Sequence, residues 1–179
     1  MNPSKLLKGL VTTFALLLTT TTFIFAQAKP PASPGATATG TLKNGAHITI
    51  SYSSPSVKGR AIWGALVPFD KVWRAGANNA TLIETDKDVK VEGKTLAAGK
   101  YSIYAIPGQQ DWVIIINSVT GQSGMNHDGS STLDPTKDVM RVAVKSKKSE
   151  TMNERLVYTV NENGFVLSWD HLDVPVSIK

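Results

Sequence analysis

The sequence predicts an all-β fold: an antiparallel β-sandwich, jelly-roll-like or barrel-like, with an irregular Trp- and Arg-rich loop and at most one short helical turn. Short segments of alternating apolar and polar residues recur at roughly ten-residue intervals, separated by Gly, Pro and Asn turn signals. Beyond the N-terminal region, no segment has the apolar period of an amphipathic helix. The one place where a helical turn fits is 68–73.

The N-terminus predicts a signal peptide. Lys5 and Lys8 form a short positive region, residues 10–25 carry no charge, and residues 26–28 (AQA) have the small-x-small pattern that signal peptidase needs. We expect cleavage after Ala28 and therefore an exported protein, periplasmic or secreted. The alternative is an uncleaved anchor, which needs about 20 apolar residues, whereas this region is shorter and rich in Thr. No transmembrane segment is expected after cleavage.

The mature chain is expected to form one domain. Residues 29–40 are rich in Pro, Ala, Gly and Thr and predict a flexible lead-in. Residues 41–179 are long enough for a single β-sandwich domain with a sizeable core. The chain contains no Cys, which excludes disulfides, thiol nucleophiles and Cys-ligated metals. The formal net charge of +5 falls to +3 when Lys5 and Lys8 leave, and we predict no nucleic-acid partner.

The first strands of the domain follow a hairpin signal. Asn44-Gly45 predicts a type I′ turn, which requires positive φ at both residues. The segment after it alternates, so that Ile48, Ile50 and Tyr52 lie on one face of a strand.

Two later segments, 101–106 and 112–116, are apolar on both faces. Such segments are typical of neighbouring strands in the middle of a sheet that is covered on both sides. A long polar loop is expected over 118–136. The last third of the chain alternates like a meander, with apolar residues at 140, 142 and 144; 156, 158 and 160; 165, 167 and 169; and 174, 176 and 178.

The patterns that usually carry chemistry predict no metal site, no cofactor and no catalytic residue. His47, His127 and His171 lack the spacing that places two imidazoles on one metal. Residues 126–129 (NHDG) resemble part of a calcium loop, but Gly124 stands where another oxygen ligand is needed. A polar turn is the preferred interpretation of that run.

One block, 51–81, departs from regular alternation. It contains two of the four Trp and two of the four Arg in the chain. Aromatic faces beside guanidinium and amide groups are typical of pockets for sugars or small anions. We therefore predict a ligand-binding site formed by Arg60, Trp63, Trp73, Arg74 and Asn78.

A structural explanation of the same block remains open. In this alternative Arg60 or Arg74 pairs with Asp70 or Glu84 and fixes a long irregular loop over the sheet, with the Trp residues as core anchors. Irregular backbone needs side-chain hydrogen-bond partners of this kind.

Eight segments of the chain together resemble the motifs of a known family. They are 52–60 (YSSPSVKGR), 62–64 (IWG), 66–69 (LVPF), 71–78 (KVWRAGAN), 80–81 (AT), 96–107 (LAAGKYSIYAIP), 112–117 (WVIIIN) and 138–142 (DVMRV). The family is the domain of unknown function 2911 family, found mainly in exported proteins of Bacteroidota and their relatives. The resemblance implies a secreted or periplasmic β-domain of unestablished function, with no assigned catalytic residues. Residues 122–132 depart from the Trp-containing stretch expected there.

Three functional hypotheses follow. The first is a non-enzymatic envelope protein that binds a small polar or saccharide-like ligand, or a partner protein, at the Arg60–Arg74 block. The second is a hydrolase with a site assembled from His127, Asp128 and Arg74. The third is a purely structural envelope protein. An enzyme would require a His within hydrogen-bond reach of an acid in the same cleft.

Overall fold

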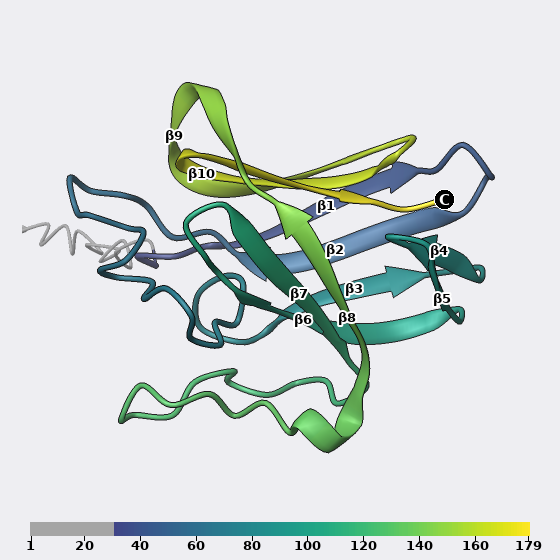
Figure 1. The fold of residues 1–179 in the computed structure, drawn as a ribbon, viewed down its shortest axis with the longest axis horizontal. Coiled ribbons are helices and arrows are strands. Elements are labelled where there is room, and N and C mark those ends of the chain that lie inside the picture. Colours follow the sequence, from purple (N-terminus) through teal and green to yellow (C-terminus); the bar gives the residue numbers. More distant parts are fainter. Residues whose placement is uncertain (1–30) are drawn as a thin grey trace, which may run out of the picture.

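Ten β-strands and one 3-10 turn form the structure, a computed structural model that describes residues 31–179 (Figure 1). The predicted signal peptide, its cleavage after Ala28 and the first two residues of the lead-in lie outside the described residues. The elements are β1 (Gly35–Thr41), β2 (His47–Ser53), β3 (Thr81–Thr85), β4 (Val89–Val91), β5 (Lys94–Leu96), β6 (Gly99–Ile106), β7 (Asp111–Asn117), η1 (Pro135–Lys137), β8 (Asp138–Lys145), β9 (Lys147–Asn161) and β10 (Gly164–Ser177). The all-β prediction is confirmed.

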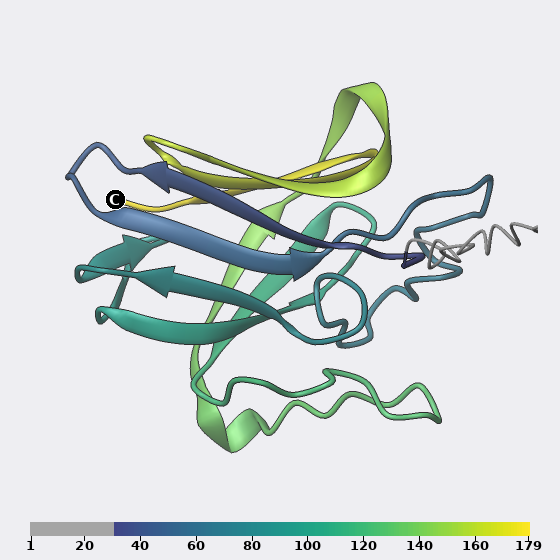
Figure 2. The ribbon, with the colours of Figure 1, turned by 180° about the vertical axis from the view of Figure 1, so that it is seen from behind.

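The strands form three antiparallel groups. Six of them make one sheet in the order β1-β2-β3-β6-β7-β8, while β9 pairs with β10 and β4 pairs with β5. The long β9–β10 hairpin lies over the six-stranded sheet (Figures 1 and 2). The described residues contain no helix that is long and apolar enough to cross a membrane.

The main core fills the space between the large sheet and the β9–β10 hairpin. Alternate residues of each strand enter it, since successive side chains of a strand point to opposite faces. Ile48 and Ile50 of β2 are buried in the same cluster as Leu167 and Trp169 of β10. The alternating segments of the sequence therefore predicted the core-facing positions.

The second face of β6 and β7 is also covered, as their two-sided apolar pattern predicted. These strands are neighbours inside the sheet. Tyr104 and Ile115 are buried in a smaller cluster with Ala80, against which the loop residues Val72 and Leu133 pack. Loops, rather than a further sheet, thus form the outer layer over the central strands.

The predicted lead-in is too long. Residues 35–41 form β1, which pairs with the full length of β2, from Gly35 opposite Ser53 to Thr41 opposite His47. A β-carbon on Gly40 would lie 2.7 Å from Val160 Cγ1 of β9. The small residues that suggested flexibility instead allow β1 and β9 to approach each other closely.

Two turn predictions are corrected by the backbone. Gly45 has φ of 79° but Asn44 does not have positive φ, and Asn44 Oδ1 accepts a hydrogen bond from Ala46 N. The predicted type I′ turn is therefore wrong at this hairpin. Both central residues have positive φ instead at Glu92-Gly93, between β4 and β5 (48° and 83°). The one helical turn of the described chain is η1, and 68–73 forms non-helical turns.

Candidate functional site

The irregular block between β2 and β3 is held by strands of both layers. On one side Val57 N donates a hydrogen bond of 2.7 Å to Glu154 O of β9. On the other, Trp73 and Ala105 of β6 exchange two backbone hydrogen bonds of 2.8 Å. The block therefore spans one end of the sandwich, and its side chains are placed by the packing of the two layers.

Three side chains fix the backbone turn that follows Trp73. Tyr158 Oη and Thr81 Oγ1 both donate to Ala75 O, at 2.8 and 2.9 Å, and Trp73 Nε1 donates to Gly76 O at 3.1 Å. Ala75 is fully buried and has φ of 53°, a conformation that costs a residue with a β-carbon free energy. Such a conformation persists because the surrounding contacts hold it.

All four Trp of the chain form one cluster beneath the block. Trp63 packs edge-to-face on Trp112, Trp169 and Trp73, with ring centroids 5.0, 5.7 and 5.9 Å apart. Trp73 and Trp169 are stacked, with centroids 6.1 Å apart and ring planes 17° from parallel. Edge-to-face packing places the positive indole edges against negative ring faces. Among residues 31–179, Nε1 of Trp63, Trp112 and Trp169 has no hydrogen-bond acceptor.

A cavity of about 260 Å³ opens between the block and this cluster. Its wall combines three of the predicted site residues with residues of β10, of the lead-in, and of the loop that joins β7 to η1 (118–134). The lining residues are Ser33, Pro55, Arg60, Leu66, Val67, Trp73, Arg74, Gly76, Ala77, Met125 and Trp169. We call it the two-arginine cavity.

The other two predicted site residues do not line the two-arginine cavity. Trp63 packs against Trp73 within the indole cluster. Asn78 Nδ2 donates to Ser33 O at 3.1 Å and lies 3.2 Å from Ser53 Oγ. Asn78 thereby holds the lead-in beside the cavity.

Both guanidinium groups are anchored by backbone carbonyls. Arg60 Nε donates to Val57 O at 3.0 Å and its Nη2 donates to Ser56 O, while Arg74 Nη1 donates to Ser123 O at 3.1 Å. The Arg60 bonds connect two parts of the block, and the Arg74 bond connects the block to the 118–134 loop.

Neither arginine has a carboxylate partner among the described residues. Neither Arg60 nor Arg74 pairs with Asp70 or Glu84, and Glu84 instead lies 3.7 Å from Lys100 Nζ, so that part of the structural alternative is wrong. Its other part is confirmed, because both arginines bond to loop carbonyls and the Trp residues of the block pack in the core. Partial burial lowers the pKa of Arg74, since removal from water disfavours the charged form. The cavity wall therefore carries two positive charges, neither of which forms an ion pair within residues 31–179.

Three residues of the cavity wall were not predicted from the sequence. Trp169 occupies an ordinary core position in an alternating strand, Met125 lies in a polar loop, and Ser33 belongs to the supposed lead-in. None of these residues carries a local signal for binding. They reach the cavity only because distant segments meet there.

None of the described residues that line the two-arginine cavity could serve as the general base of a hydrolase. Of the residues described, no His lines it. His127 is exposed in the 118–134 loop, and the neighbouring Asp128 carboxylate accepts hydrogen bonds from Ser130 N and Oγ, at 2.9 and 2.6 Å. These bonds lower the pKa of Asp128. The acid thus faces Ser130, and the predicted set of His127, Asp128 and Arg74 does not line one site.

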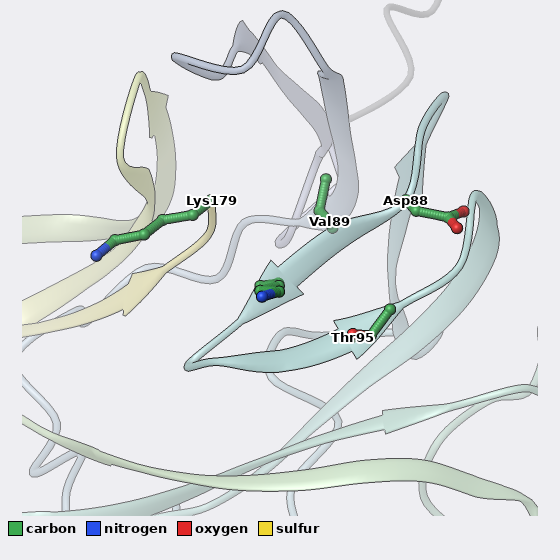
Figure 3. Close-up of a pocket in the computed structure, with 5 residues that line it drawn as sticks. Asp88, Val89, Thr95 and Lys179 are labelled. Carbon is green, nitrogen blue, oxygen red and sulfur yellow. The ribbon is translucent and has the colours of Figure 1, made fainter.

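A second hollow, of about 340 Å³, lies beside the β4–β5 hairpin and the C-terminal residue. Figure 3 shows that the Asp88 carboxylate and the Lys179 ammonium group point away from each other. Asp88 Oδ1 accepts a hydrogen bond from Ala98 N at 2.8 Å. Because these two opposite charges point apart and none of the described residues that line this hollow is aromatic, the two-arginine cavity is the stronger candidate.

Residues 33–178 match the family described as protein of unknown function (DUF2911). The chain belongs to the DUF2911 family. The resemblance found in the sequence is thereby confirmed, and the DUF2911 match includes β1 and every residue that lines the two-arginine cavity. No curated protein and no solved structure matches the chain.

Proposed function

We propose that this DUF2911 protein is a non-enzymatic binding protein of the cell envelope, which holds a small polar, saccharide-like molecule in the two-arginine cavity. One observation carries the proposal: Arg60 and Arg74 line the same cavity as the stacked indoles of Trp73 and Trp169. The two indoles are buried and form an apolar floor for one face of a sugar ring, and guanidinium N–H groups donate to its oxygens.

The size and shape of the cavity favour a small molecule over a partner protein. Its volume of about 260 Å³ lies just below the roughly 300–1,000 Å³ of pockets for drug-sized ligands. A single sugar ring suits this space better than an oligosaccharide. Protein interfaces, in contrast, are broad surfaces of about 800 Å² on each partner.

Export is part of the proposal and is supported by the N-terminal sequence. Cleavage after Ala28 would start the mature chain four residues before Ser33, which lines the cavity. Mass spectrometry of the protein purified from the periplasm or the medium of its host tests this step. A mass that still includes residues 1–28 would contradict it.

Binding is tested by calorimetric and fluorescence titration of the chain 29–179 with single sugars: D-glucose, N-acetyl-D-glucosamine and D-glucuronate. Because Trp73 and Trp169 line the cavity, a bound sugar should change the intrinsic fluorescence. Arg74→Gln should weaken binding at least about tenfold, or 1.4 kcal/mol.

Arg155→Gln is the matched control. Arg155 Nη1 also donates to a backbone carbonyl, Ser54 O at 3.2 Å, but Arg155 does not line the cavity. Each substitution removes one charge and one such hydrogen bond. Equal binding by both variants and the wild type, or binding of neither these three sugars nor D-glucose 6-phosphate, would refute the proposed function.

A further inference from the structure

We infer that the ligand of the two-arginine cavity carries an oxyanion, a carboxylate or a phosphate, on a body the size of one sugar ring. This inference rests on the proposed function and adds the charge of the ligand to it. Three features of the cavity support it: the charges of its wall, the N–H groups that the two arginines still offer, and the contacts that hold both side chains.

The wall carries charge of one sign only. Arg60 and Arg74 are its only ionisable side chains among the residues described, and the remaining lining residues are neutral. Neither arginine forms an ion pair within residues 31–179. An anionic ligand would supply the counter-charge that both guanidinium groups lack within residues 31–179.

Each guanidinium group keeps N–H donors for a ligand. An Arg side chain has five N–H donors. Within residues 31–179, Arg74 uses one nitrogen, Nη1, for Ser123 O, and Arg60 uses Nε and Nη2 for Val57 O and Ser56 O. Charge-assisted hydrogen bonds from guanidinium to a carboxylate or phosphate are roughly twice as strong as neutral ones. An oxyanion would therefore use these donors better than a hydroxyl group.

Both arginines are held in place before any ligand binds. The carbonyl contacts fix the guanidinium groups, and the backbone next to Arg74 is fixed at Ala75 by Tyr158 and Thr81. Gly124 packs directly on the Arg74 stem, because a β-carbon there would lie 2.5 Å from Arg74 Cβ. A site ordered in advance avoids much of the entropy cost of binding.

Matched sugars test the inference in the chain 29–179. D-glucuronate and D-glucose 6-phosphate supply the two oxyanions, while D-glucose and the methyl ester of D-glucuronate supply neutral bodies of similar shape. We expect at least one oxyanion to bind about tenfold or more tightly than its neutral counterpart by calorimetry. The preference should shrink as salt is raised, because salt screens partly exposed charges.

The two charged sugars also distinguish a carboxylate from a phosphate as the negative group of the ligand. Tighter binding of D-glucuronate than of its methyl ester supports a carboxylate ligand, and tighter binding of D-glucose 6-phosphate than of D-glucose supports a phosphate ligand. Arg74→Gln should abolish the preference, while Arg155→Gln should keep it. Arg74→Lys, which keeps the positive charge, should retain part of it.

The failure of this inference differs from the failure of the proposed function. Equal affinity for charged and neutral sugars would refute the oxyanion requirement, but the proposed binding function would still hold. No binding of any of the four sugars would overturn both. A preference that survives in Arg74→Gln while the near-ultraviolet circular dichroism shows an intact Trp cluster would overturn the assignment of the charge to this cavity.

Discussion

Gly124 and Arg74 are in direct contact: a β-carbon on Gly124 would lie 2.5 Å from Arg74 Cβ. The contact joins the 118–134 loop to the irregular block, and the residues on either side of Gly124 take part in the site. Ser123 O accepts the hydrogen bond from Arg74, and Met125 lines the cavity. Only Gly has room at this position, and its φ of 77° also favours Gly.

Gly124→Ala should therefore destabilise the protein through both strain and steric clash. Gly129→Ala is the control, because Gly129 lies in the same loop with φ of 83° but has nothing within 4 Å of the added carbon. We expect Gly124→Ala to cost about 1–3 kcal/mol more than Gly129→Ala in urea unfolding. Equal losses would show that the loop does not press on Arg74.

The two arginines should differ in their contribution to stability. Arg60 makes two part-buried hydrogen bonds to carbonyls, whereas Arg74 makes one exposed bond. We expect Arg60→Gln to lower the free energy of unfolding by about 1–2 kcal/mol and Arg74→Gln by about 1 kcal/mol or less. Thermal melts and urea unfolding without ligand measure both. A larger loss for Arg74→Gln would assign that residue a mainly structural role.

Tyr158 should make stability fall at alkaline pH. Burial raises the pKa of Tyr158 well above its usual value of 10.0, so the folded state holds the phenol proton more tightly than the unfolded state. The stability that the neutral phenol contributes is fully present below about pH 10, the unfolded pKa, and is lost as pH rises above it.

Tyr158→Phe removes this proton and the hydrogen bond to Ala75 O. We expect the variant to be about 1 kcal/mol less stable near neutral pH and to show a flatter loss of stability above about pH 10. Urea unfolding over the two pH ranges measures both effects. Parallel curves for the two proteins above pH 10 would contradict the assignment to Tyr158.

The Trp cluster should give a coupled near-ultraviolet circular dichroism signal. Trp63 touches all three other indoles, with centroids 5.0 to 5.9 Å away. Trp63→Phe should therefore remove more of the signal than the loss of one indole explains. Tyr101→Phe is the control, because Tyr101 is a partly buried aromatic that belongs to none of the close ring pairs of residues 31–179. A loss of one quarter of the signal at most would contradict coupling.

β1 should be required for folding although its composition resembles a linker. A chain that begins at Ser33 keeps β1, and a chain that begins at Leu42 exposes the edge of β2 and the surface of Val160. We expect the first to melt like the chain 29–179 and the second to unfold or aggregate, because unpaired strand edges associate. Cooperative melting of the shorter chain would show that β1 is dispensable.

Part of the candidate site could be predicted from the sequence, and the reason is physical. Arg60, Trp73 and Arg74 stand out because an irregular, aromatic and Arg-rich block interrupts the alternation of a β protein. Trp169 and Met125 carry no comparable signal, since an indole in an alternating strand resembles any core residue. The predicted ion pairs failed because sequence spacing says nothing about which carboxylate lies within reach of a guanidinium group.

Local chemistry in the chain determined the all-β class, the core-facing positions and the central place of β6 and β7, because alternation and turn residues act over a few neighbouring residues. Only the tertiary structure decided that 35–41 is a strand, that four indoles meet, and that Gly124 supports Arg74. These features depend on which distant segments approach each other, and that choice is made by the packing of the whole core.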